Sequence, residues 1–362
     1  MKKHYPGFYK PSKEAITSLW QNATVVFDTN VLLDLYRVSS ETAQKLIEIV
    51  AFFANQNKIF IPNQVAKEYH RNLLETVLMQ KAKYSNALKS LKEFEQKVSE
   101  KRNHPYLTAK LKERFSSLLV DIESSFKEQT LKIEKILTQP SIKDKLAELL
   151  DGKVGDGYSE EELKAIKEEG NLRYAEKVPP GFKDADKSSD NQYGDLIIWK
   201  EVLDYAKSNQ TGIIYVSSDV KDDWYLRLHG VTYGPHPELI KEFIDYTNQN
   251  IYLYSLDMFL IEANKQKVVN ISQTSLDEVE NVIRTKRDTD MGSLIAPGSI
   301  TGRRRLANES PQFLSHLTGF SSPLSEMMRT NDALGKVTGA TLRETLPHIS
   351  GANLFGSLKS ES

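Results

Sequence analysis

Four acidic residues stand at positions where a carboxylate could do chemistry. Asp28 ends the apolar run TVVF, Asp219 ends GIIYVSSD, and Glu68 and Asp195 lie on segments with helical spacing. A buried carboxylate costs free energy unless a hydrogen bond or a cation compensates its charge. Clustered carboxylates offer only oxygen ligands, which favour Mg²⁺ or Mn²⁺, and such ions activate water for phosphodiester hydrolysis. The alternative for Asp28 and Asp195 is that each caps a helix.

The flanking segments indicate how these carboxylates would be brought together. Short runs of β-branched and aromatic residues predict strands at 24–28, 58–62 and 212–219. Helical spacing predicts helices at 39–56 with Ser40 as the N-cap, from Asn63 onward, and at 195–209. A last strand and helix are expected within 252–264. Alternating strands and helices favour a parallel sheet, whose carboxyl ends meet at one edge where ligands bind.

The charged region from 73 to about 138 predicts a long helical hairpin inserted into this domain. Helical spacing runs through it, and His104 and Pro105 interrupt it near the middle. Lysine and arginine outnumber acids there, with Lys89, Lys92 and Lys97 in the first arm. Two interpretations stay open: a solvated helix face, or an arm that contacts a phosphate backbone.

Composition limits the function classes. The chain of 362 residues has no cysteine and a formal net charge of −1. These values exclude disulfides, thiolate metal sites and cysteine nucleophiles, and they give no global electrostatic signal for nucleic acid or anionic lipid. No apolar run is long enough for a membrane span. We therefore expect a cytoplasmic protein without a membrane partner, whose oligomeric state the sequence leaves open.

The character of the sequence changes after Lys265. The stretch 266–362 is rich in Ser, Thr, Gly and Asn, with one credible helix at 275–287, where Ser275 and Glu278 have capping-box spacing. We therefore predict a domain at 1–265 and a partly flexible C-terminal tail at 266–362. The tail is a candidate site for a protein partner.

Four blocks of sequence occur in an order that resembles a known family. They are VVFDTNVLL, QVAKEYHRN, YGDLIIW and YVSSDVKDDW, and they resemble the PIN domain, a nuclease fold related to flap endonucleases. The segments LLDLYR, PPGFKDADK and YGDLIIWK are similar to a bacterial PIN-like branch. The resemblance covers roughly 20–262, although the predicted hairpin is longer than the compact family core needs.

The resemblance implies a Rossmann-like α/β/α sandwich with a mainly parallel sheet, and a Mg²⁺- or Mn²⁺-dependent endonuclease that cuts RNA in preference to DNA. The family's acidic quartet of catalytic and metal-binding residues matches Asp28, Glu68, Asp195 and Asp219. Asp223 matches a later acidic ligand, and Ser217 matches the small hydroxyl residue before the last acid. Family members also suggest a toxin or defence role.

Further residues are candidates for orienting or gripping roles. Asn30 is predicted to orient Asp28 by a hydrogen bond, and its alternative is a turn residue. Arg37 would contact a phosphate or bridge an acid structurally. The polar loop GFKDADK offers Lys183, Asp184, Asp186 and Lys187, which would grip substrate or supply an extra ligand, or would remain exposed loop charges.

The leading hypothesis from the sequence is a metal-dependent ribonuclease. One alternative is a non-catalytic module that binds nucleic acid or protein on a PIN-like scaffold. Another is a structure-specific DNase whose helical hairpin clamps the duplex.

Overall fold

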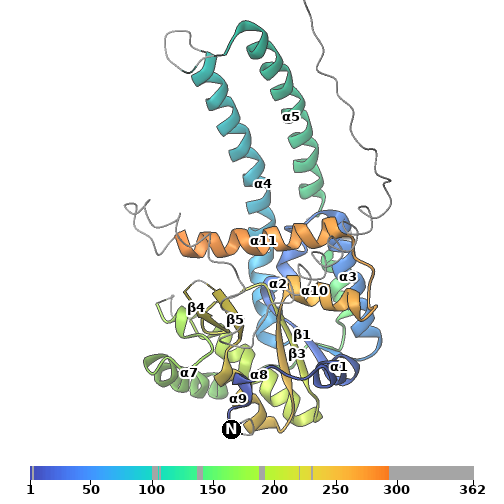
Figure 1. Cartoon of the computed structure of the whole chain (residues 1–362), viewed down its shortest axis with the longest axis vertical. Coiled ribbons are helices and arrows are strands. Elements are labelled where there is room, and N and C mark those ends of the chain that lie inside the picture. The colour runs from blue at the N-terminus through green and yellow to red at the C-terminus, as the bar shows by residue number, and fades with distance from the viewer. Residues whose placement is uncertain are drawn as a thin grey trace, which may run out of the picture. The chain divides into compact units, whose positions relative to one another are not determined.

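A four-stranded parallel sheet forms the centre of the fold in the computed structural model of the chain (Figure 1). Its strands are β1 (Thr24–Phe27), β2 (Ile59–Phe60), β3 (Ile213–Ser217) and β6 (Ile251–Ser255), in the spatial order β2-β1-β3-β6. All three pairings are parallel. The predicted parallel sheet is therefore confirmed, including the last strand.

The structure describes residues 1, 4–99, 105, 107–136, 142–186, 192–219, 221–229 and 231–292, with side chains up to Arg284. The described helices are α1 (Lys13–Asn22), α2 (Thr29–Asp34), α3 (Ser40–Asn55), α4 (Asn63–Ser99), α5 (Ala109–Ile136), α6 (Ile142–Leu149), α7 (Glu160–Ala175), α8 (Gly194–Asn209), α9 (Pro237–Thr247), α10 (Leu256–Lys265) and α11 (Gln273–Gly292). None of them is both long and apolar enough to cross a membrane.

Aromatic side chains hold helices against both faces of the sheet. On one face, Trp20 of α1 stacks on Phe259 of α10 with ring centroids 5.2 Å apart, and Phe259 also meets Phe27 of β1 at 5.6 Å. On the other face, Phe60 of β2 stacks on Tyr205 of α8 at 3.9 Å. Stacked and edge-to-face aromatic pairs add to the free energy of apolar burial. The result is the predicted α/β/α sandwich.

A second sheet is not predicted from the sequence. Strands β4 (Tyr225–Leu228) and β5 (Val231–Pro235) pair antiparallel, with a register shift between Leu226 and Arg227. Such an irregularity breaks the alternation of apolar and polar residues by which a strand is recognised. The segment is also mostly exposed or half-buried, so it lacks the continuous apolar run of β1 and β3.

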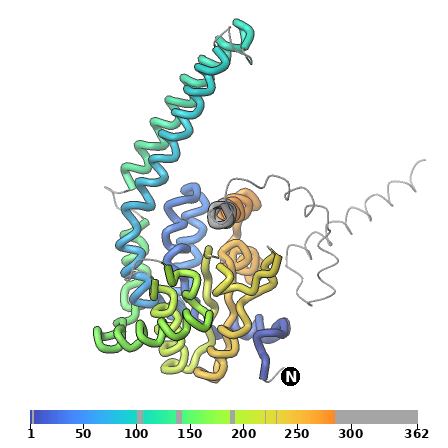
Figure 2. Tube along the Cα trace, turned by 90° about the vertical axis from the view of Figure 1, so that its left-hand side faces the viewer, coloured from blue at the N-terminus to red at the C-terminus, as the bar shows by residue number. Residues whose placement is uncertain are grey.

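Helices α4 and α5 lie side by side and extend away from the sheet, as Figures 1 and 2 show. Rings join them, with Tyr84 against Phe126 at 5.1 Å and Phe94 against Phe115 at 5.7 Å. Within α5 only Leu119 is buried. The predicted helix pair is therefore present, and its first arm continues without a break from the helix that follows β2.

Helix α11 belongs to the same core as the sheet. Its Val279 and Ile283 are buried in the main apolar cluster. Glu278 accepts hydrogen bonds from the Ser39 Oγ at 2.8 Å and the Thr42 Oγ1 at 2.6 Å, at the start of α3. Two sequence predictions are corrected here. Ser39, not Ser40, is the N-cap of α3, and Glu278 bonds to another helix instead of closing a capping box with Ser275.

The division of the chain at Lys265 stays a prediction. Val269 and Ile271, beyond that point, are buried together with Val279 and Ile283. Burying an apolar side chain stabilises a fold by about 1.5–3 kcal/mol. We therefore propose that the domain extends past Ile283. The rest of the predicted tail lies outside the described residues.

Candidate functional site

A cleft with a volume of about 410 Å³ lies at the carboxyl edge of the parallel sheet. Its acidic lining residues are Asp28, Glu68, Asp184, Asp195 and Asp219. They come from the end of β1, from α4, from the short 3₁₀ turn η2 (Phe182–Asp184), from α8 and from the segment after β3. The fold thus brings together the four predicted acids and adds Asp184. The catalytic roles of these residues remain predictions.

Asp28 is held by donors on all sides. It is 6% exposed. Its Oδ1 accepts from the Thr29 backbone N–H at 2.7 Å, and its Oδ2 accepts from Asn30 Nδ2 at 2.7 Å and Ser217 Oγ at 2.8 Å. Burial, followed by the nearby charge of Asp195, raises the pKa of Asp28 to about 7, although the Ser217 bond opposes this shift. Asp28 therefore caps α2 and also points its carboxylate into the cleft.

Asn30 and Ser217 connect the ends of two neighbouring strands. Asn30 Nδ2 donates to Ser217 Oγ at 3.0 Å, and Asn30 Oδ1 accepts from the Ser218 backbone N–H at 2.7 Å. Ser217 Oγ also accepts from the Asp219 backbone N–H at 3.0 Å. These bonds place Asp28 and Asp219 on one rim of the cleft, in the orienting arrangement that the sequence predicts for Asn30.

Glu68 projects from the first turns of α4. Its Oε1 accepts from Gln64 Nε2 at 2.7 Å and its Oε2 from Thr29 Oγ1 at 3.1 Å. Burial raises the pKa of Glu68, and Asp195 adds to the shift, while the Gln64 bond opposes it. A Cβ on Gly194 would lie 2.5 Å from Glu68 Oε1, so any other residue at this position would require the Glu68 carboxylate to move.

The start of α4 is anchored by a buried acid on α8. Glu201 is 8% exposed, and its Oε2 accepts from the Gln64 backbone N–H at 3.2 Å. Burial raises the pKa of Glu201 to about 7. A carboxylate at a helix N-terminus satisfies backbone donors that have no partner within the helix. Glu201 thereby fixes the turn of α4 that carries Glu68.

A lysine lies among the acids of the cleft. Lys221 Nζ is 3.0 Å from Asp184 Oδ2, 3.1 Å from Asp219 Oδ2 and 3.5 Å from Asp195 Oδ2. Burial opposes its charged form, but the acids outweigh burial and raise the pKa of Lys221.

Asp195 also accepts from the Trp224 indole N–H at 3.2 Å. It lies in the first turn of α8 and makes no capping bond, because the N-cap position is Tyr193.

Asp223 lies behind the cleft and does not line it. It is 0% exposed, and its Oδ2 accepts from the backbone N–H groups of Gly181 at 3.0 Å and Lys183 at 3.3 Å. Burial raises the pKa of Asp223 to about 6, with Asp195 contributing next. These bonds hold the turn that carries Asp184 into the cleft. The structure thus presents Asp184 to the cleft where the sequence predicted Asp223.

The predicted substrate-binding residues have different environments. Arg37 lines the cleft and pairs with the buried Asp34 at 2.7 Å, so it bridges an acid while facing the site. Lys183 is exposed and pairs with Asp222 at 3.2 Å, outside the cleft lining. Lys187 lies outside the described residues.

Sequence reasoning missed two cations of the cleft, Lys221 and Arg71. Arg71 lies one turn after Glu68 on α4, and this spacing alone could have placed both on one helix face. Lys221 follows Asp219 by two residues, in a segment whose shape the sequence pattern does not determine.

The donor types of the cleft fit a hard divalent cation. All acidic lining groups supply oxygen. Burial, together with the charge of Asp195, raises the pKa values of Asp28 and Glu68, and a bound cation would favour the charged form of both groups. In the described part of the chain, however, no group of three or more acidic or histidine side chains is arranged so that it could hold a metal ion. Lys221 lies among the acids that would have to move together around such an ion.

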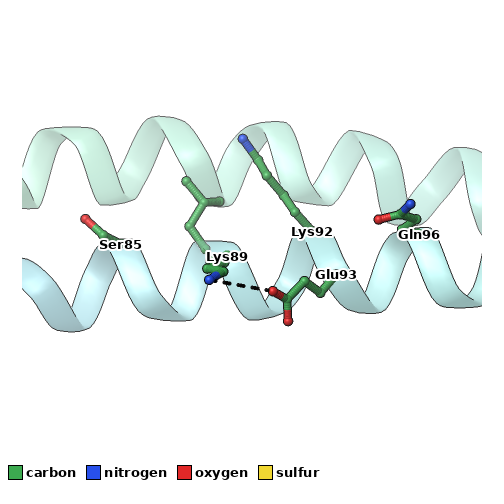
Figure 3. A pocket seen from close by; sticks show the side chains of 6 residues that line it. Ser85, Lys89, Lys92, Glu93 and Gln96 are labelled. Atoms are coloured by element: carbon green, nitrogen blue, oxygen red, sulfur yellow. Dashed lines mark ion pairs between the residues drawn. The ribbon is translucent and has the colours of Figure 1, made fainter.

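The exposed arm of α4 carries a second hollow, shown in Figure 3. It has a volume of about 410 Å³ and is lined by Ser85, Leu88, Lys89, Lys92, Glu93 and Gln96. Lys89 lies 4.0 Å from Glu93, and Lys92 lies 3.0 Å from Glu123 of α5. Lys89 and Lys92, two of the lysines that would contact phosphate, are therefore partly neutralised by acids of the hairpin itself.

Comparison with known proteins identifies the region that holds the cleft. A family model described as PIN like domain matches residues 24–239, which is more than half of the chain. The match runs from β1 to the start of α9 and includes every acid of the cleft. No curated protein and no solved structure matches the chain.

Proposed function

Because this chain belongs to the PIN-like domain family, we propose that it is a divalent-metal-dependent endonuclease that hydrolyses phosphodiester bonds, with RNA preferred to DNA. PIN-like domains are generally nucleases and typically use divalent metals, so the family supports the reaction class. The choice of metal, substrate and cleavage mode is our proposal.

One observation carries the proposal: five carboxylates from separate segments converge on one cleft. Like charges at close range repel, and a protein keeps such an arrangement at a cost in stability. Burial is the main reason that the pKa values of Asp28 and Glu68 are raised, and the charge of Asp195 adds to both shifts. Perturbed carboxylates gathered in a cleft at a sheet edge are typical of a functional site.

The residues of the chain would divide the work by position. Asp28, Glu68, Asp195 and Asp219 would hold Mg²⁺ or Mn²⁺, and Asp184 completes the acidic wall. A bound divalent cation would supply a Lewis acid that activates water and offsets charge on the phosphate. Asn30, Ser217 and the Thr29 backbone hold Asp28 in one orientation, while Gln64 and Thr29 hold Glu68.

The cationic side of the cleft suits a phosphate backbone. Arg37 and Arg71 line it on the side of α2 and α4. An arginine presents several donors in a planar fork that matches phosphate oxygens. The pair with Asp34 uses Nη1 of Arg37, which leaves its remaining donors to be aimed at a ligand. We propose that a nucleic acid enters along α4, with its scissile phosphate between these arginines and the acids.

One observation favours the alternative of a non-catalytic binding module. The ammonium of Lys221 already compensates three of the acids, so the cleft does not require a metal ion to be stable. The same acidic residues would then serve only to support the fold.

Cleavage assays separate these functions. Labelled RNA, single-stranded DNA and flapped duplex DNA are incubated with the full-length protein in Mn²⁺ and, separately, in EDTA. The proposal predicts cleavage of RNA that EDTA stops and that Asp28→Asn abolishes. Asp121→Asn, an exposed acid of α5, is the matched control and should cleave normally.

The outcomes are distinct. Cleavage confined to the flapped duplex would make the protein a structure-specific DNase. Binding of nucleic acid without metal-dependent cleavage of any of the substrates would establish the binding module and overturn the nuclease.

A further inference from the structure

The ammonium of Lys221 lies among three carboxylates of the cleft. Its ammonium lies within 3.5 Å of carboxylate oxygens from Asp184, Asp195 and Asp219. These acids belong to the turn η2, to α8 and to the segment after β3. An ammonium has three donors, so one side chain can serve all three acids. Lys221 therefore joins segments that are remote in sequence.

The half-buried Lys200 has a different environment. Lys200 on α8 provides the comparison, because its side chain is 24% exposed and that of Lys221 is 23% exposed. Lys200 pairs with Glu169 at 2.7 Å, and it does not line the cleft. The two residues share type, exposure and ion pairing, so they differ mainly in the number of acids around the ammonium.

We propose that Lys221 is a tethered counter-ion that competes with a divalent cation for the carboxylates of Asp184, Asp195 and Asp219. The inference rests on the proposed function only in treating these acids as a cation site. It deepens that function by naming the residue that sets the cation affinity of the cleft.

Charge and geometry together require the competition. An ammonium at 3.0–3.5 Å from three carboxylates occupies the space that a cation with short oxygen bonds needs. Two like-charged groups cannot share that space, because their repulsion in a partly buried site is large. Lysine has a flexible stem, so its head group can withdraw when a divalent ion enters. The apparent affinity is then reduced by the fraction of molecules in which Lys221 holds the acids.

A Mn²⁺ titration by calorimetry tests this competition directly. The metal-free full-length protein is compared with Lys221→Met and with the matched control Lys200→Met. We expect Lys221→Met to bind Mn²⁺ about tenfold more tightly or better, because no ammonium has to be displaced. Lys200→Met removes the same charge nearby and should bind as the wild type does. Unchanged or weaker binding by Lys221→Met would overturn the proposal.

A second measurement uses the wild-type chain and does not depend on a variant that folds. Exposed lysines are reductively methylated with and without Mg²⁺, and the modified peptides are quantified by mass spectrometry. Competition predicts that Mg²⁺ increases methylation of Lys221 severalfold while methylation of Lys200 stays constant. If Mg²⁺ leaves Lys221 as unreactive as before, the ammonium is not displaced and the proposal is overturned.

The two proposals fail in different ways. Tighter Mn²⁺ binding by Lys221→Met without cleavage of any substrate supports the counter-ion and removes the nuclease. Metal-dependent cleavage by the wild type with no gain in affinity for Lys221→Met keeps the nuclease and removes the counter-ion. Absence of Mn²⁺ binding in every protein overturns the counter-ion, because there is then no cation to compete with.

Discussion

The two ends of helix α4 carry charge in different ways. Near the sheet, Glu68 is held by Gln64 and Thr29, and burial raises its pKa. On the projecting arm, Lys89 lies 4.0 Å from Glu93 and Lys92 lies 3.0 Å from Glu123, with all four side chains about half exposed or more. The same kinds of residue thus meet two environments along one helix.

The difference shows what burial contributes to chemistry. Exposed ion pairs are screened by water and contribute about 0–1 kcal/mol. Buried charges interact strongly and are destabilising unless they are compensated. In the proposed function, Glu68 and its neighbours therefore bind the cation, whereas the exposed charges of the arm only attract nucleic acid. Four predictions test this contrast.

The largest effect is expected from Asp28→Asn. Removing one charged oxygen ligand should lower metal-dependent cleavage by about 100-fold or more, since even loss of an outer partner of a metal ligand costs about 10–100-fold. The melting temperature of the metal-free protein should stay the same or rise, because the variant removes a buried charge. Cleavage rate and thermal melting are measured on the same preparation.

The exposed control defines the contrast for that prediction. Asp121→Asn on α5 changes the same chemical group where water surrounds it, and both readouts should match the wild type. If Asp28→Asn cleaved within a few-fold of the wild type, the catalytic assignment of the cleft would be lost.

The second prediction concerns the C-terminal boundary of the folded domain. A chain ending at Lys265 loses the buried side chains of Val269, Ile271, Val279 and Ile283. At about 1.5–3 kcal/mol each, their loss rivals the roughly 5–15 kcal/mol by which a whole domain is stable. We expect this chain to be unfolded or to melt far below the full-length protein. A chain ending at Gly292 should melt normally, and equal melting of the two shortened chains would restore the boundary at Lys265.

Sequence patterns located the elements that are either fully buried or strictly periodic. The runs TVVF and IIYVS are apolar except for Thr24 and Ser217, and all their residues are buried in β1 and β3. The spacing of α8 reflects its buried face, and Ser159 and Glu162 form a capping box at the start of α7, three residues apart in the sequence. Local chemistry determines these features, so a single sequence carries them.

Features that depend on remote contacts could not be read in this way. Lys221 meets Asp184 because Asp223 holds the turn 181–184 by its backbone N–H groups. Glu278 matches a capping box by spacing, yet its partners are Ser39 and Thr42 on another helix. In both cases the partner lies far away in the sequence, and spacing contains no information about it.

The third prediction concerns pH and the anchor of α4. Glu201 faces the Gln64 backbone N–H, the carboxylate of Glu68 and the hydroxyl of Tyr158, and burial raises its pKa from 4.5 to about 7. The folded state therefore binds a proton more tightly than the unfolded state, and stability falls as pH rises from 4.5 to about 7. Glu201→Gln removes this dependence.

Denaturant unfolding of both proteins across that range provides the measurement. The stability of Glu201→Gln relative to the wild type should increase with pH, by at most about 3 kcal/mol once the wild-type acid is ionised. A difference that stayed constant with pH would show that Glu201 has an ordinary pKa in the fold.

The smallest effect is expected from the arm. Replacing Lys89, Lys92 and Lys97 by glutamine should weaken nucleic-acid binding modestly and flatten its salt dependence. Each lost phosphate contact lowers the slope of log affinity against log salt by about 0.7–0.9. The change should stay below the full value for three contacts, because Glu93 and Glu123 already neutralise Lys89 and Lys92. Binding is measured over a range of salt concentrations.

Replacing Lys200, Lys207 and Lys241 on α8 and α9 removes the same charge away from the arm and should leave the slope unchanged. If both triple variants have the slope of the wild type, the arm is a scaffold, and α4 contributes to binding only through its buried end.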